Sequence, residues 1–193
     1  EEGNPIDNIT TTIPVENFKI IDTTTNSMKV SWDKETNQEY QLYILDENNN
    51  EIIRSNWIDD NNYTFSDLPK PNTKYVPHII TRNKEVSSFI GPYKTSTEKP
   101  YTDAENLYKG TFESDLRSIK VILDTSSSNN PDYTEYEIRN DITGSSKTVT
   151  HNEPIWIDTN LAEESYYTYS VRVFNKNGKL SNYFKITFSN GEP

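Results

Sequence analysis

The sequence predicts an all-β fold, arranged as two consecutive seven-stranded β-sandwiches. Short segments of alternating apolar and polar residues recur along the chain, with turn residues about every 8–12 positions. No window of 11 or more residues keeps apolar residues at the helical spacing i, i+3, i+4, i+7. The pattern of the first half returns about 91 residues later, which indicates a duplicated structural unit.

The composition agrees with β structure. Hydrophobic residues make up 32% of the chain, but 12% of the residues are aromatic, including 13 Tyr. Because each aromatic side chain buries a large area, a Tyr-rich chain can build a core from few apolar residues. The chain has no cysteine, which excludes disulfides and thiolate metal sites. It has no run of 18 apolar residues, so we predict no membrane insertion.

The charge of the chain is acidic throughout. The net charge is −11, and a division between Lys99 and Pro100 leaves 10 basic and 16 acidic residues before it and 9 and 14 after it. Both halves would repel nucleic acid and anionic lipid, because binding to phosphates depends on a basic surface. We therefore predict no nucleic-acid partner and interpret the charge as that of a solvated surface.

We predict a flexible N-terminal leader over residues 1–13, a first domain over residues 14–99 and a second domain over residues 100–193. The linker between the domains, Thr97–Asp103, is short and contains no Gly. Such a linker should limit relative motion more than a Gly/Ser tether would. Because the chain begins with Glu rather than Met, we expect a mature protein or an excised segment.

The first unit opens at Pro14–Phe18, and its pattern returns at Ala104–Leu107. Ser27–Asp33 then alternates between apolar and polar residues, which predicts a half-buried strand. Ser118–Asp124 repeats Ser, Lys, Val and Asp in the same places. The residues predicted to face the core are Met28, Val30 and Trp32 in the first copy and Ile119, Val121 and Leu123 in the second.

Further matched segments follow in the same order in both halves. They comprise two strand openings, two hairpin-like turns, two later strands and two terminal strands. In that order the pairs are Glu39–Leu42 and Glu135–Ile138, Asp46–Glu51 and Asp141–Ser146, Tyr63–Leu68 and Trp156–Leu161, and Ser87–Phe89 and Ser181–Phe184.

One more matched pair, Leu68–Tyr75 and Leu161–Tyr167, has the pattern of a corner between sheets. In each copy a hydrophobic residue precedes a polar turn, then Thr or Ser, one further residue and Tyr. A sandwich needs a rigid crossover from one sheet to the other. A Tyr ring can pack at the edge of the core while its hydroxyl bonds to a backbone group upstream in the turn. We predict this role for Tyr75 and Tyr167.

Together these motifs resemble the fibronectin type III domain, twice. The family has a strand that ends in Trp, a third strand that opens with Tyr, a Leu-x-Pro-x-Thr-x-Tyr corner and a following strand that ends in Asn. The matching residues are Trp32, Tyr40 and Tyr136, the corner of Leu68, Pro71, Thr73 and Tyr75, and Asn83 and Asn175. The resemblance covers about residues 14–97 and 104–190, and it implies a fold shared by spacers, adhesive modules and receptor ectodomains.

Four positions depart from the family pattern. Leu123 replaces a core Trp, so the second core should lose its aromatic centre, and Glu163 replaces the corner Pro. Pro77 falls inside a central strand, where it predicts a bulge or a break because Pro donates no ladder hydrogen bond. Asp158 falls at a position expected to be buried, which leaves a register shifted by one residue as an open alternative.

The sequence offers no constellation for catalysis. The two histidines, His78 and His151, lie in different halves, and His78 should face the surface. The acidic turns Asp46–Glu51 and Asp59–Asn62 could hold Ca²⁺, but neither has the spacing of a calcium loop, and such residues are typical of hairpin turns. We predict no catalytic residue, no cofactor-binding residue and no metal ligand.

Two aromatic residues and one turn are candidates for binding. Trp57 is expected to be partly exposed, and Tyr166 should face away from the core if Tyr167 faces it, so either ring could stack on a sugar. The Asn175–Gly178 turn suits a hairpin with positive φ. In the family this loop often carries ligand contacts, but no Arg-Gly-Asp tripeptide is present. The sequons at Asn8 and Asn62 matter only in a eukaryotic secretory pathway.

We therefore expect a non-enzymatic spacer or adhesion segment, extracellular or at a cell surface, monomeric and part of a larger protein. Its partner would be another protein or a cell-surface polysaccharide. The alternatives are an accessory carbohydrate-binding module of a secreted hydrolase and a phage tail or virion surface component. The heavy use of Asn, Lys, Ile and Tyr is typical of a bacterium with an AT-rich genome.

Overall fold

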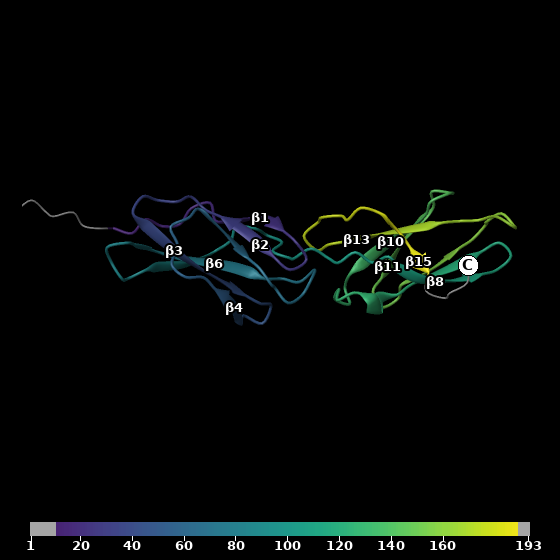
Figure 1. Ribbon diagram of the computed structural model, residues 1–193, viewed down its shortest axis with the longest axis horizontal. Helices are drawn as coiled ribbons and strands as arrows, with labels where there is room; N and C mark the ends of the chain where they lie inside the picture. The colour runs from purple at the N-terminus through teal and green to yellow at the C-terminus, as the bar shows by residue number, and fades with distance from the viewer. Residues whose placement is uncertain (1–10, 189–193) are drawn as a thin grey trace, which may run out of the picture. The chain divides into compact units, whose positions relative to one another are not determined.

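The computed structural model describes residues 11–188, which contain 15 strands and one 3-10 turn, η1 (Thr125–Ser127). The chain divides into two compact units (Figure 1). Unit 1 comprises Glu1–Leu68 and Lys74–Pro100, and unit 2 comprises Pro69–Thr73 and Tyr101–Pro193. In residues 11–188 no helix combines the length and the apolar character that crossing a bilayer requires.

Unit 1 consists of a three-stranded and a four-stranded sheet, ordered β1-β2-β5 and β4-β3-β6-β7. All of its strand pairs are antiparallel. Seven strands in two sheets agree with the predicted sandwich. The strands are β1 (Lys19–Thr23), β2 (Met28–Ser31), β3 (Gln38–Leu45), β4 (Glu51–Arg54), β5 (Asn62–Phe65), β6 (Val76–Asn83) and β7 (Ile90–Lys94).

Unit 2 repeats this arrangement in two four-stranded sheets, ordered β12-β9-β8-β15 and β11-β10-β13-β14. Its last strand is divided: β14 pairs antiparallel with β13, whereas β15 pairs parallel with β8 in the other sheet. The strands are β8 (Lys109–Ser114), β9 (Ile119–Leu123), β10 (Glu135–Asn140), β11 (Ser146–Thr150), β12 (Ile155–Asp158), β13 (Tyr169–Phe174), β14 (Phe184–Lys185) and β15 (Thr187–Phe188).

The core of unit 1 lies between its two sheets, as the alternation of β2 predicted. Met28 and Val30 are completely buried and Trp32 is 4% exposed. Trp32 packs against Tyr40, with ring centroids 5.3 Å apart, and edge-on against Phe18. Such tilted and edge-to-face pairs add to the energy of burial, so these rings form the centre of the first core.

The core of unit 2 has an aromatic centre, contrary to the prediction drawn from Leu123. Leu123 is buried as expected, but Tyr169 on β13 provides a ring that is 1% exposed. Trp156 and Phe112 pack edge-on against Tyr169, with centroids 5.9 Å and 5.4 Å away. The aromatic position has therefore moved from the second strand of the unit to its sixth, and the core keeps its large rings.

Asp158 is buried, so the predicted register of its strand is right and the alternative of a one-residue shift is wrong. On β12, Trp156 and Asp158 face inward, whereas Ile155 and Ile157 are 44% and 56% exposed. The Asp158 carboxylate accepts hydrogen bonds from the Tyr169 hydroxyl and from Asn140 Nδ2, both at 2.7 Å. These two partners compensate for the loss of water around a buried carboxylate.

Pro77 does not interrupt β6, and the prediction of a bulge or break at this residue is wrong. The pairing of β6 with β3 runs through Pro77 opposite Ile44 without a shift. The Pro77 carbonyl accepts from the Thr95 amide, just beyond the last ladder pair of β7, His78 with Lys94. The nitrogen and carbonyl of one residue point to the same side of a strand, so the nitrogen of Pro77 faces β7. Pro77 lies beyond the last pair of the ladder between β6 and β7, so the N–H that proline lacks removes no hydrogen bond from that ladder.

The predicted corner is present in unit 2. The Tyr167 ring packs against the core, and its hydroxyl accepts a hydrogen bond of 2.9 Å from the Ala162 amide, five residues upstream. Tyr75, its counterpart, is 1% exposed in the core of unit 1. Leu68 and Leu161, which begin the two corners, are also buried.

The first ten residues of the predicted leader lie outside the described part of the chain. At the start of the described residues, Ile13 is held by the side chain of Gln38. Its amide donates to Gln38 Oε1 at 2.6 Å, and its carbonyl accepts from Gln38 Nε2 at 3.0 Å. Gln38 is itself 1% exposed, so this backbone segment is attached to the core of unit 1.

Candidate interaction surface

Three loops at one end of unit 1 form a polar surface. They are residues 32–37 between β2 and β3, residues 55–61 between β4 and β5, and residues 84–89 between β6 and β7. Asp59 in the second loop bonds to Lys34 of the first, at 2.8 Å, and to Lys84 of the third. One carboxylate therefore joins all three loops.

The electrostatics of this cluster favour the ionised states of Asp59 and Lys34. Hydrogen bonds from Lys34 and Lys84 lower the pKa of the Asp59 carboxyl, and the hydrogen bond to Asp59 raises the pKa of Lys34. All three side chains remain well exposed to solvent, so water and salt screen their attraction. We conclude that the cluster orients the loops more than it stabilises the fold.

A polar hollow of about 400 Å³ lies among the three loops, with Asp59 contributed by the second loop. Its backbone is supported from below, because the Glu35 amide donates to the Tyr40 hydroxyl at 2.8 Å and the Lys84 amide donates to the Asn37 carbonyl at 3.0 Å. Charged and amide groups line it, so its chemistry suits a polar protein surface better than an apolar ligand. The lining residues are Lys34, Glu35, Thr36, Asn37, Asp59 and Lys84.

Trp57 is partly exposed, as predicted, but one face of its ring is covered. The guanidinium carbon of Arg82 lies 3.9 Å from the ring centroid, and Arg82 Nε bonds to Glu39 at 2.7 Å. This arrangement is a cation–π contact whose cation is held by a carboxylate. A sugar ring could therefore stack on Trp57 from one side only. Tyr166, the other aromatic candidate, is 97% exposed.

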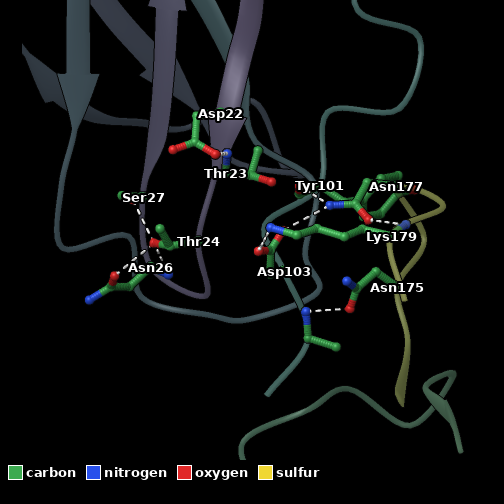
Figure 2. A network of polar contacts seen from close by, with 11 residues as sticks. Asp22, Thr23, Thr24, Asn26, Ser27, Tyr101, Asp103, Asn175, Asn177 and Lys179 are labelled. Atoms are coloured by element: carbon green, nitrogen blue, oxygen red, sulfur yellow. Dashed lines mark hydrogen bonds and ion pairs between the residues drawn. The ribbon is translucent and has the colours of Figure 1, made fainter. Parts of the chain in front are cut away.

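The Asn175–Gly178 turn of unit 2 has the predicted positive φ, +86° at Gly178, but its polar side chains serve the structure of the unit. Asn175 Oδ1 accepts from the Ala104 amide, and Asn177 Nδ2 donates to Asp103 Oδ1 at 3.1 Å (Figure 2). Lys179, just after the turn, contacts the other Asp103 oxygen at 2.6 Å. The turn thus holds the segment that enters unit 2, which leaves fewer groups for a ligand.

The acidic turn Asp46–Glu51 is a hairpin turn, as predicted. Asp46 Oδ1 accepts from the backbone amides of Asn48, at 2.8 Å, and Asn50, at 2.9 Å, and Asn49 has a φ of 62°. Across residues 11–188 no three side chains among His, Cys, Asp and Glu are gathered in a way that could hold a metal ion.

The structure places the two histidines in different units, each against a tyrosine. His78 is half-buried on the outer face of its sheet and stacks on Tyr43, with ring centroids 5.1 Å apart. Burial lowers the pKa of His78. His151 lies with its Nδ1 2.8 Å from the Tyr136 hydroxyl. Neither contact brings together a nucleophile, a base and an orienting group.

Sequence reasoning missed a charged aromatic cluster on the outer face of the sheet containing β10 and β13. Arg139 and Arg172 lie over the Tyr183 ring, 3.8 Å and 4.6 Å from its centroid, and Glu137 bonds to both Tyr183 and Arg172. The alternation of Glu137 and Arg139 along β10 could have revealed an outward charged row. The position of Tyr183 depends on strand pairing and had no local signal.

Comparisons with known proteins agree with this geometry. Residues 13–93 match the family model of the fibronectin type III domain. The two-domain fibronectin type III segment of chicken tenascin is 13% identical with a TM-score of 0.53, and the match covers 89% of this chain and 96% of that one. The FN1–FN3 domains of chicken CNTN1 are 16% identical with a TM-score of 0.38, over 89% of this chain and 66% of that one.

A comparison with curated proteins found no match. The identity to the tenascin segment is low, so that likeness concerns the fold alone. It nevertheless extends across both units, and unit 2 repeats the strand order that the family model covers in unit 1. Residues 13–93 thus match the fibronectin type III family and unit 2 repeats the fold of that segment, so the chain folds as two consecutive fibronectin type III-like β-sandwiches.

Proposed function

We propose that this tandem is a non-enzymatic spacer or adhesion segment of an extracellular or cell-surface protein, which positions neighbouring domains or contacts another protein. Fibronectin type III domains generally serve as interaction or spacer modules and are typically not enzymes. The observation that carries the proposal is the way in which backbone hydrogen bonds secure the chain on both sides of the boundary between the units.

Each unit holds its own end of this boundary. Within unit 1 the Pro100 carbonyl accepts from the Tyr75 amide at 3.0 Å. Within unit 2 the Thr102 amide donates to the Thr73 carbonyl at 3.0 Å, and Thr102 Oγ1 accepts from the Thr73 amide at 3.1 Å. Thr102 is completely buried. We expect a connection secured in this way to limit relative motion more than a flexible Gly/Ser tether would.

Distances between spin labels test the spacer role. The chain has no Cys, so Asn48→Cys in unit 1 and Ser145→Cys in unit 2, both exposed turn positions, would give one label each. We expect a narrow distribution of distances, and a broad one when six Gly/Ser residues are inserted between Pro100 and Tyr101. Equally broad distributions in both proteins would contradict a stiff spacer.

The second candidate function is an accessory carbohydrate-binding module, or a phage tail or virion component that contacts a glycan. Trp57 is the feature that favours it, because its side chain is partly exposed although Arg82 lies over one face of the ring. Pull-down on insoluble glycans and cell-wall fractions separates the candidates. Retention that is lost in Trp57→Ala but kept in Tyr166→Ala would favour the module, and no retention on any glycan would favour the spacer.

A further inference from the structure

Within residues 11–188 the edge strand β12 of unit 2 has one unpaired side. In that part of the chain it pairs with β9 alone, at one end of its sheet. The Leu123 amide donates to the Pro154 carbonyl, so residues 154, 156 and 158 direct their backbone groups toward β9. By the alternation of an antiparallel ladder, the amides and carbonyls of Ile155 and Ile157 point to the open side. This edge therefore offers two donors and two acceptors to another strand.

The same two residues expose their side chains. Ile155 is 44% exposed and Ile157 is 56% exposed, and Ile122 of β9 lies half-buried opposite Ile155. In unit 1 the corresponding edge strand, β5, has exposed Asn62 and Thr64 at the matching positions. The two copies therefore differ at this edge: polar residues in unit 1 have isoleucines in their place in unit 2.

Several other edges of the two sandwiches carry features that discourage strand addition. Exposed charged residues lie on β4 (Glu51 and Arg54), on β7 (Lys94, close to Pro92) and on β11 (Lys147). Charge and Pro on an edge are the usual protection against pairing between molecules. On β12 the one charged residue, Asp158, faces the core and is bonded to Tyr169 and Asn140. This edge therefore has no exposed charge.

We propose that β12 is a self-association edge, on which a second copy of this chain adds its own β12 in antiparallel orientation. The sequence of the edge is self-complementary. A two-fold axis at Trp156 would place Ile155 of one copy opposite Ile157 of the other, with four backbone hydrogen bonds between them. Four isoleucines would then gather on one face of a continuous sheet of eight strands.

The charge around the edge is compatible with this pairing although the chain carries −11. In the same register Glu153 would lie opposite Thr159 of the other copy, so no carboxylate would face another. Pro154 would lie opposite Asp158, and its ring nitrogen would point toward β9 of its own copy. The pairing between the two copies would therefore not need an N–H from Pro154. A second copy therefore meets neither like charge nor an unpaired amide.

The contact is small. A strand of four residues with two isoleucines buries far less than the roughly 1,200–2,000 Å² of a stable interface. We therefore expect a weak dimer, with a Kd on the order of 1 mM. Such an affinity would have an effect where many copies are held close together and would leave the dilute chain monomeric.

The experiment is sedimentation velocity on the whole chain from about 0.05 to about 2 mM, a range that brackets this affinity, together with ¹⁵N chemical shifts over the same range. We expect a sedimentation coefficient that rises with concentration and shift changes confined to β12, β9 and their turns. Ile157→Lys and Ile157→Thr, the latter restoring the residue type of unit 1, should abolish both effects.

The matched control is Ile142→Lys, in the turn between β10 and β11. Ile142 is 66% exposed, and its replacement changes the net charge as much as Ile157→Lys does. It should leave self-association unchanged. A sedimentation coefficient independent of concentration in the unaltered chain, equal loss in Ile142→Lys, or shift changes on another face would each overturn the proposal.

Discussion

At the scale of single residues, Asp158 shows how a residue that breaks the strand pattern is accommodated. Its carboxylate is 4% exposed and lies between the Tyr169 hydroxyl and Asn140 Nδ2. Burial, followed by the hydrogen bond to Asp158, raises the pKa of Tyr169 far above its ordinary value. The phenol therefore stays protonated above the pH at which an exposed tyrosine ionises.

This triad predicts unequal effects for two substitutions of Asp158. Asp158→Ala leaves the hydroxyl of Tyr169 and the amide of Asn140 without their acceptor in the core, which should cost about 3 kcal/mol of unfolding free energy. Asp158→Asn keeps one carbonyl acceptor and should cost less. Urea unfolding followed through Trp156 measures both. Equal losses would show that the acceptor has no special role.

The Tyr167 corner predicts a second contrast between neighbouring residues. Tyr167→Phe removes the acceptor of the Ala162 amide and should lower the unfolding free energy of unit 2 by about 0.5–1.5 kcal/mol. Tyr166→Phe changes the same group on a side chain that is 97% exposed and should have no measurable effect. Denaturant midpoints compare the two variants, and identical midpoints would refute the corner. We expect Tyr75→Phe to destabilise unit 1 in the same range.

His78 predicts a pH dependence of unit 1. Burial lowers its folded pKa below the unfolded value of about 6.5. The unfolded state therefore binds the proton more tightly. The contribution of His78 to the stability of unit 1 is fully present above about pH 6.5 and is lost as the pH falls through the folded pKa. The contact with the Val76 carbonyl opposes this lowering of the pKa, and the positive charge of Lys94, across the ladder, adds to it.

Unfolding of unit 1 between pH 7 and 5 measures this dependence. His78→Phe keeps a ring against Tyr43 and removes the titrating group, so its stability should decline less over that range. A decline as steep as that of the unaltered chain would assign the pH dependence to other groups.

At the scale of elements, the alternation of apolar and polar residues along each strand predicted most of the buried faces. Ser27–Asp33 revealed its buried face because a strand with one face in the core alternates with period two. The same reasoning placed Asp158 at a buried position on β12 but left a register shifted by one residue open, and the structure decides for burial. It failed at Pro77, because whether a missing N–H matters depends on where the neighbouring strand ends, and that is a property of the pair.

The candidate surface was less predictable for the same reason. Trp57 was identified as partly exposed, but the guanidinium of Arg82 over its ring comes from another strand and depends on register. The three loops joined by Asp59 also come from separate parts of the chain, and nothing local in each loop indicates the others. The Asn175–Gly178 turn was predicted as a turn, whereas its bonds to residues 103 and 104 were not.

This turn supplies the prediction at the scale of an element. Gly178 has a φ of +86°, and a Cβ added there would meet no atom within 4 Å. The cost of Gly178→Ala is therefore conformational alone, about 1 kcal/mol of unfolding free energy for unit 2. Gly178→Asn should cost less, because Asn tolerates positive φ better than Ala. Thermal unfolding of the two variants measures the order, and Ala as stable as Asn would contradict it.

At the scale of the whole molecule, the duplication determines how energy is distributed. Each unit has its own core, one centred on Trp32 and Tyr40 and the other on Tyr136 and Tyr169, and in the described part of the chain no buried residue belongs to both. The aromatic residues that make up for the low aliphatic content of the chain are thus divided between two small cores. A change inside one core should therefore be felt within that unit first.

Hydrogen exchange on the whole chain tests this separation. Leu42 is completely buried in the first core, so Leu42→Ala should lower the unfolding free energy of unit 1 by about 2–5 kcal/mol. The slowest amides of β3 and β6 would then exchange faster by the corresponding factor, whereas those of β10 and β13 would keep their rates, because local stability follows the core that encloses each amide. Val121→Ala should have the reverse pattern. Acceleration of both sets by either variant would mean that the tandem unfolds as one cooperative body.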